Sequence, residues 1–301
     1  MNTPTTTPAI AQIRRLITAH RQTEGAGFVV RRPIPTAGVE LVDPFLLIDE
    51  MGPADYAPGE AVGAPDHPHR GFETVTYALE GAFEHEDSAG HRGTLGPGDV
   101  QWMTAGGGVI HSEEPSQRIR QQGGRVHGFQ VWVNLPARLK MTQPRYQEVK
   151  AEGIPTATTA DGTASVRVIA GEALGARAVI DTHTPITFQD WTVEPGADVT
   201  VGLAHGQRAL VYVFAGVAGV GDGAELVRDG QLAVLGAGDS VRLRGPATGS
   251  ARLLLLAGTP IGEPVARYGP FVMNTRDEIM QAIRDFQSGR MGAIVRTARV
   301  G

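Results

Sequence analysis

An internal repeat constrains the fold of this 301-residue chain more than any other feature of its sequence. The first copy has YALEG at residues 77–81 and LGPGDVQWM at 95–103; the second has YVFAG at 212–216 and LGAGDSVRL at 235–243. In both copies a β-type run ends at glycine, and a Leu-Gly-X-Gly-Asp turn then leads into another β-type run. Gly-Asp turns are common in β proteins, but two elements that recur in the same order favour two copies of one β fold.

Short β-rich runs separated by turn residues fill most of the chain. The sequence contains 40 Gly and 20 Pro, a content that favours many tight turns. Runs such as FETVTYALEG, VHGFQVWVNLP and ARLLLLAGTP are typical of strands in an all-β sandwich or barrel. We therefore predict an all-β fold.

The exception is TRDEIMQAIRDFQSGR at residues 275–290, which predicts one amphipathic α-helix near the C-terminus. Thr275 and Glu278 fit a capping box at its start. An apolar stripe at helical spacing needs burial and is made by Ile279, Ile283 and Phe286.

Charge and cysteine content exclude several classes of function. The formal net charge of −5 provides no basic surface for direct binding of nucleic acid or anionic membranes. Cysteine is absent, so disulfides, zinc–thiolate sites and cysteine nucleophiles are excluded, and a metal could be held only by His, carboxylate and water. No run of 18 apolar residues and no signal-peptide core occurs, so we expect a cytoplasmic location and no membrane span.

Two pairs of potential metal ligands stand 42 residues apart. Side chains two apart in a strand share a face, so His67 and His69 form one pair and His111 and Glu113 the other. Glu73 has the same phase as the first pair. If the two strands lie side by side, the ligand pairs meet at one site.

The other histidines favour less specific interpretations. His85 and His91 lie in the acidic stretch FEHEDSAGH and are expected to be solvated turn residues. His127 is in phase with Phe129, which suits either a hydrogen-bonded core histidine or a pocket wall.

The stretches HPHRGFETVTYALEG, PGDVQWMTAGGGVIHSEEP and VWVNLP resemble those of the pirin family. Pirins are bicupins, so the resemblance implies two cupin β-barrels or jelly rolls that face each other. The repeat places the boundary between the copies at roughly residues 136 to 147, so we expect a metal-binding N-terminal cupin at 1–140 and a C-terminal cupin plus helix at 141–301.

The resemblance also implies a ligand set. The family's metal ligands fall on His67, His69, His111 and Glu113. It assigns Glu73 a place beside the ligands or an ion pair with Arg70 or another base, although the general cupin pattern His-X-His-X3-Glu would make Glu73 the carboxylate ligand.

The second copy is expected to hold no metal. Counting from the repeat motifs, the positions equivalent to the four ligands are Gly202, Ala204, Ala251 and Leu253. None of these side chains can bind a metal ion.

Three imidazoles and one carboxylate suit iron, nickel, copper, zinc, cobalt or manganese. The resemblance implies one Fe²⁺ per chain. Because some pirin-like proteins are quercetin 2,3-dioxygenases, it also implies a flavonol substrate, with Glu113 as the group that takes its proton. Candidate walls for an aromatic substrate, each of which could instead be ordinary core, are Phe72, Trp102, Met103 and Phe129.

A second hypothesis is a regulator without catalytic activity. Other pirins bind transcription factors or metabolic enzymes, and their iron then responds to redox conditions. The net charge of −5 is compatible with a protein partner. A third hypothesis is a small-molecule isomerase, since cupins support such chemistry. We expect a monomer in each case.

Overall fold

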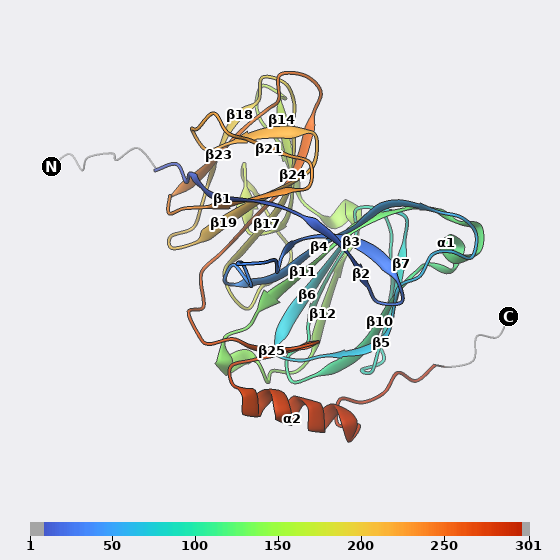
Figure 1. Cartoon of the computed structure of the whole chain (residues 1–301). Coiled ribbons are helices and arrows are strands. Elements are labelled where there is room, and N and C mark those ends of the chain that lie inside the picture. Colours follow the sequence, from blue (N-terminus) through green and yellow to red (C-terminus); the bar gives the residue numbers. More distant parts are fainter. Residues whose placement is uncertain (1–8, 297–301) are drawn as a thin grey trace. The chain divides into compact units, whose positions relative to one another are not determined.

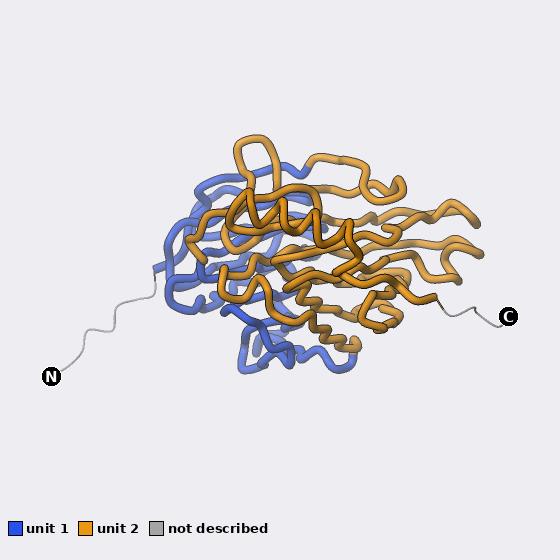
Figure 2. Tube along the Cα trace, turned by 90° about the horizontal axis from the view of Figure 1, so that it is seen from below, with its two compact units in different colours: residues 1–19, 152–260 blue, residues 20–151, 261–301 orange. Residues whose placement is uncertain are grey.

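A computed structural model describes residues 9–296. Strands make up 53% of the chain and helices 8%, which confirms the predicted all-β class. The chain forms two compact units that are not contiguous in sequence. Unit 1 contains residues 1–19 and 152–260, and unit 2 contains residues 20–151 and 261–301 (Figure 2). The cupin bounds 1–140 and 141–301 stay a prediction. They divide the sequence at one point, whereas each compact unit contains one end of the chain and a separate internal segment.

Unit 2 consists of two antiparallel sheets and a C-terminal helix (Figure 1). Its larger sheet has the strand order β12 (Arg145–Val149), β9 (Val100–Thr104), β6 (Phe72–Glu80), β11 (Gly124–Asn134), β4 (Phe45–Tyr56), β3 (Phe28–Ile34), β2 (His20–Glu24). Its smaller sheet has the order β5 (Ala64–His69), β10 (Val109–Pro115), β7 (Phe83–Asp87), β8 (Arg92–Leu95). The remaining elements of unit 2 are α1 (Gln117–Gln122), the 3-10 helix Ala137–Leu139, the hairpin β25 (Ala266–Tyr268) and β26 (Phe271–Met273), and α2 (Arg276–Gln287). A second 3-10 helix, Ala151–Gly153, spans the boundary between the two units in the sequence.

Unit 1 repeats this arrangement. Its larger sheet has the order β1 (Ile13–Thr18), β22 (Gln231–Leu235), β19 (Arg208–Ala215), β24 (Ala251–Gly258), β17 (Ile186–Val193), β14 (Ala164–Ala170), β13 (Thr156–Thr158). Its smaller sheet has the order β18 (Asp198–Gly202), β23 (Ser240–Arg244), β20 (Val217–Val220), β21 (Leu226–Arg228), and a short hairpin joins β15 (Glu172–Ala173) to β16 (Ala176–Arg177). Aliphatic side chains and Trp191 fill its core.

The two units correspond strand by strand. Among the described residues, each unit has a seven-stranded and a four-stranded sheet. Apart from the edge strands β1 and β12, the chain alternates between the two sheets of each unit in the same order. In the described part of the chain no strand pairing joins the two sheets of a unit, so the units are cupin-type sandwiches and not closed barrels. The repeat predicted from the sequence is thus present in the fold.

The second motif of the sequence repeat, Leu-Gly-X-Gly-Asp, lies at turns that are not equivalent in the two units. YALEG and YVFAG lie on the corresponding strands β6 and β19. In contrast, LGPGD precedes β9, whereas LGAGD follows β22, the counterpart of β9. Both turns need glycine, but for different reasons: Gly98 has φ +85° in the first motif, and a Cβ at Gly238 in the second would lie 2.5 Å from the backbone nitrogen of Ala11.

The C-terminal helix α2 begins and ends where its sequence predicts. Thr275 caps it in a capping box with Glu278, and the helix lies against β25 and β26 (Figure 1). Ile279 is buried in a cluster with Phe271, and Ile283 packs beside it. The third stripe residue, Phe286, keeps 39% exposure, so the stripe is only partly covered. No helix in residues 9–296 is long and apolar enough to cross a membrane.

Candidate metal centre

Pairing of β5 with β10 brings the two predicted ligand pairs together. In this antiparallel ladder His111 lies opposite His67, and Val109 lies opposite His69. The three imidazoles point to one side, and one nitrogen of each lies within 4.8 Å of the others. Glu113 follows on the same strand, with Oε2 3.8 Å from Nε2 of His111. The alternation read from the sequence therefore holds on both strands.

The imidazoles present free nitrogens, and two of the three rings are buried. His69 and His111 are buried, and His67 is half-buried. Nδ1 of His67 donates to the carbonyl oxygen of Pro65 at 2.7 Å, and Nδ1 of His69 approaches that of Pro270 at 3.4 Å. These contacts leave Nε2 of both rings available. Within residues 9–296, neither ring nitrogen of His111 has a hydrogen-bond partner, an arrangement that a metal ion would satisfy.

Protonation of the site is disfavoured. Burial, followed by the charges of His67 and His111, lowers the pKa of His69 well below its ordinary value of 6.5. Burial, followed by His67 and His85, lowers the pKa of His111 in the same way. Neutral imidazoles are the form that binds metal, so at neutral pH a metal ion need not displace protons from these two rings.

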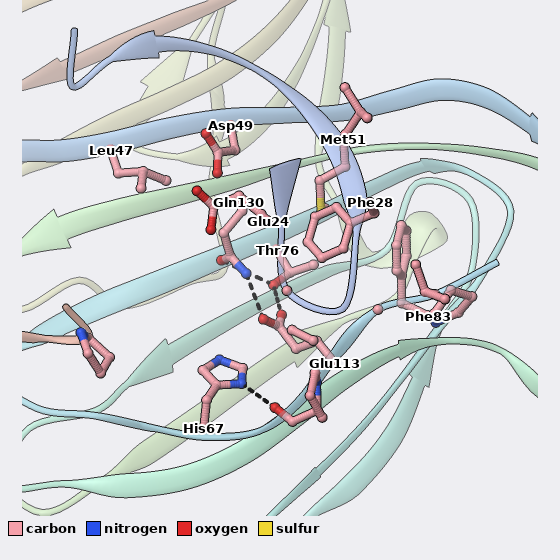
Figure 3. Close-up of a pocket in the computed structure, with 18 of the residues that line it drawn as sticks. Glu24, Phe28, Leu47, Asp49, Met51, His67, Thr76, Phe83, Glu113 and Gln130 are labelled. Carbon is pink, nitrogen blue, oxygen red and sulfur yellow. Dashed lines mark hydrogen bonds between the residues drawn. The ribbon is translucent and has the colours of Figure 1, made fainter. Parts of the chain in front are cut away.

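Glu113 is held in place by two side chains of the larger sheet. Oγ1 of Thr76 donates to its Oε1 at 2.7 Å, and Nε2 of Gln130 donates to its Oε2 at 2.8 Å. Thr76 and Gln130 lie opposite each other on β6 and β11. Glu113 lies between this pair and His67 (Figure 3). Each carboxylate oxygen can accept more than one hydrogen bond, so both retain a free lone pair.

The expectation that Glu73 lies beside the ligands is corrected. The strand that carries His67 and His69 ends at His69, and Glu73 lies on β6 in the other sheet. Glu73 pairs with Val133 and lies an odd number of residues from Thr76 on the same strand. Its side chain therefore points to the face opposite Thr76 and Gln130. There it accepts a hydrogen bond from Thr104 at 2.7 Å.

The break between β5 and β6 requires glycine. Gly71 has φ +90°, and a Cβ at this position would lie 2.0 Å from the carbonyl oxygen of Val272. Arg70 does not pair with Glu73, as one alternative predicts; it donates to Asp285 on α2 at 2.7 Å and to the Gly107 carbonyl. The C-terminal segment therefore contacts the chain directly after the candidate ligand His69.

A cavity of about 590 Å³ opens onto the site. His67, His69 and Glu113 line one part of it. Most of its remaining wall is apolar and includes Phe28, Leu47, Met51 and Phe83 (Figure 3). Trp132 also lines it. All of its lining residues belong to unit 2.

The predicted cavity walls are wrong, because Phe72, Trp102, Met103 and Phe129 are fully buried and none lines the cavity. Trp102 and Phe129 share the far face of the larger sheet with Val75. Met103 packs in an apolar cluster, and Phe72 packs behind the ring of His69. The alternative interpretation, ordinary core, describes them.

Two other histidines are explained by their strands. His85 is buried and not a solvated turn residue, because it lies on β7 opposite Glu113 and pairs with Glu148. His91 is exposed, as expected. Nε2 of His127 donates to Oε1 of Glu50 at 2.9 Å, and His127 does not line the cavity, so it is a hydrogen-bonded core histidine.

Within the described residues, unit 1 contains no cluster of three potential metal ligands. Its strands β18 and β23, the counterparts of β5 and β10, pair Thr200 with Arg242 and Gly202 with Ser240. Ala251 and Leu253, which sequence counting placed at ligand positions, lie on β24 instead. Two of the four positions counted from the sequence are therefore corrected, and the absence of metal from the second copy stays a prediction.

The fold and the site together define a bicupin with a cluster of three histidines that could hold a metal ion in one of its two units. The family models described as Pirin and as Pirin C-terminal cupin domain match residues 27–133 and 188–292. The chain belongs to the pirin family, which confirms the resemblance read from its motifs.

Relatives match over almost their full length. The chain is 43% identical to a pirin-like protein of Solanum lycopersicum over 277 residues, covering 92% of this chain and 91% of the relative. It is 43% identical to pirin of Homo sapiens over 279 residues, covering 92% of both chains. The crystal structure of a quercetin 2,3-dioxygenase from Acinetobacter baumannii matches with a TM-score of 0.87 and 37% identity, covering 95% of this chain and all of that one.

Proposed function

We propose that the protein is a metal-dependent dioxygenase of the quercetinase type, which opens the central ring of a flavonol with O₂ and releases carbon monoxide. We further propose one Fe²⁺ per chain, held by His67, His69, His111 and Glu113, although the donor types also suit nickel, copper, zinc, cobalt or manganese.

The observation that carries this proposal is the cavity. An apolar space of about 590 Å³ lies directly against His67, His69 and Glu113, and such a volume suits a planar ligand of flavonol size. The similarity to a quercetin 2,3-dioxygenase at 37% identity supports the same substrate class.

The residues of the chain divide the work between binding and proton transfer. A bound divalent metal supplies positive charge that lowers the pKa of a substrate hydroxyl. Glu113 accepts the proton of that hydroxyl at a carboxylate oxygen, while Thr76 and Gln130 hold the carboxylate in position. The apolar walls exclude water from the reacting face of the substrate.

The test uses the purified full chain, with its metal content measured by elemental analysis. Quercetin is added to the Fe²⁺-loaded protein without O₂, binding is recorded by absorbance, and O₂ is then admitted. We expect one carbon monoxide for each quercetin consumed. If the fully loaded protein binds no flavonol and releases no carbon monoxide, the enzyme proposal fails and the regulator hypothesis, with a protein partner, takes its place.

A further inference from the structure

Four charged side chains line the part of the cavity formed by β2, β3, β4 and β25. They are Glu24, Arg32, Asp49 and Arg267. Three of them satisfy one another: Arg32 donates to Asp49 through both Nε and Nη2, and its Nη2 lies 2.8 Å from Glu24. This group contains one cation and two carboxylates, so its formal charge is −1 and it offers no unpaired cation to a ligand.

Arg267 is outside that network. Among residues 9–296, no carboxylate lies within ion-pair distance of its guanidinium. Its hydrogen bond is a long one, 3.4 Å from Nη1 to the carbonyl oxygen of Leu46. Burial, followed by the charge of Arg32, lowers the pKa of Arg267, and the charges of Asp49 and Glu24 oppose this shift only in part.

An aromatic ring connects Arg267 to the metal centre. Cζ of Arg267 lies 4.8 Å from the ring centroid of Trp132, over its face. The same ring is 5.2 Å from the imidazole of His69. All three residues line the cavity. One wall thus presents in order a candidate metal ligand, an apolar ring face and a cation with unused donors.

We propose that Arg267 determines substrate specificity by binding an anionic oxygen at the end of a planar aromatic substrate that is remote from the metal. The inference rests on the proposed function, in that the other end of the substrate binds the metal through a hydroxyl. The substrate class is then an aromatic hydroxy compound that carries a carboxylate or similar anion about one ring away. The planar guanidinium fork suits such a group, because it can donate two parallel hydrogen bonds while it remains stacked on Trp132.

The test compares three ligands on the metal-loaded full chain without O₂. They are 3-hydroxyflavone and its two derivatives with a carboxylate at position 4′ or at position 7, and dissociation constants are measured by calorimetry. We expect the wild type to bind at least one carboxylated derivative about 10- to 100-fold more tightly than the parent, the range for hydrogen bonds to a charged group. R267Q should lose this preference and bind the parent unchanged. Raising the salt concentration should reduce the preference in the wild type only.

R276Q is the matched control, since it removes an exposed arginine of the same unit and should keep the preference. If R267Q melts at a lower temperature than the wild type, R267K provides the comparison: it keeps the charge without the fork and should keep part of the preference. A wild type without preference for either carboxylated ligand, or an R267Q variant that retains it, overturns the role of Arg267. If the preference is present but quercetin yields no carbon monoxide, the proposed function fails while the specificity role stands.

Discussion

At the scale of single residues, the candidate metal centre depends on which histidine ring nitrogens already have a hydrogen-bond partner. Backbone carbonyls face Nδ1 of His67 and His69, whereas both nitrogens of the buried His111 lack a partner within residues 9–296. A buried polar group without a partner is costly, so His111 gains most from a bound ion. Sequence spacing identified all three rings. It could not identify Thr76 and Gln130, because nothing in their local pattern marks a contact with Glu113.

His111→Ala should remove most of the metal, because it deletes a ligand and loosens the geometry of the other two. Elemental analysis after purification should give close to one metal per wild-type chain and little in the variant. His91→Ala is the control, since His91 is exposed and its Nδ1 contacts Asp87. Full metal content in the His111→Ala protein would contradict the proposed ligand set.

Glu113→Gln should reduce carbon monoxide release far more than it reduces flavonol binding. The amide keeps the size of the side chain but removes the anionic ligand and the proton acceptor, which matter most in the transition state. Turnover and anaerobic binding are measured on the same preparation. Glu114→Gln on the same strand is the control, because Glu114 pairs with Arg120. Equal losses in turnover and binding would show that Glu113 only binds the substrate.

At the scale of elements, the C-terminal segment helps to build the candidate metal centre. The hairpin of β25 and β26 places the carbonyl of Pro270 beside His69, and α2 places Asp285 against Arg70. Asp285 also accepts hydrogen bonds from Gln281 and Arg290. The amphipathic pattern predicts the helix, but it does not predict that the polar side chain of Asp285 anchors the residue after a ligand.

Asp285→Asn should lower the free energy of unfolding by about 3 kcal/mol at pH 7, because it leaves the buried Arg70 without a charged partner. The hydrogen bond from Arg70, together with smaller contributions from Arg290 and Gln281, lowers the pKa of Asp285 to about 2. Burial acts in the opposite direction. A depressed carboxyl pKa stabilises the fold above its unfolded pKa of about 3.9, and this stabilisation is lost as the pH falls toward 2.

Urea unfolding of wild type and Asp285→Asn between pH 7 and pH 2 measures this effect. The difference between the two proteins should be constant down to about pH 5 and should then shrink. Asp277→Asn, an exposed position in the first turn of the same helix, is the control. A difference that does not change with pH would show that packing, not charge, is lost.

At the scale of the whole molecule, each unit includes the end of the chain that is distant in sequence from its other strands. β1 pairs with β22 at the edge of the unit 1 sheet, and β12 holds the corresponding edge position beside β9 in unit 2. Residues 261–296 in turn belong to unit 2. Each unit is therefore completed by a segment from the far end of the sequence.

Deletion of residues 1–18 should lower the melting temperature without loss of metal. The deletion removes β1 and the fully buried Ala11 from the unit 1 core, whereas all four proposed ligands lie in unit 2. Calorimetry and elemental analysis test both halves of this expectation. Ile17→Ala, which trims one buried side chain of β1, should show a smaller shift in the same direction. Loss of metal on deletion would show that the centre depends on unit 1.

The sequence alone determined what depends on residues a few positions apart. Alternation predicted the strands and placed His67 with His69, and the capping box of Thr275 and Glu278 predicted the start of α2. These patterns hold because side-chain direction in a strand and hydrogen bonding at a helix start are local properties.

Only the tertiary structure decided what depends on long-range pairing. The register of β5 against β10 joins the ligand pairs, and the break at Gly71 moves Glu73 to another sheet. The same cause placed the predicted wall residues Trp102 and Phe129 on the far face of the larger sheet. The alternation of side chains along one strand does not predict which sheet the next strand joins. That depends on hydrogen bonds between segments distant in the chain and on the side chains that they bury together.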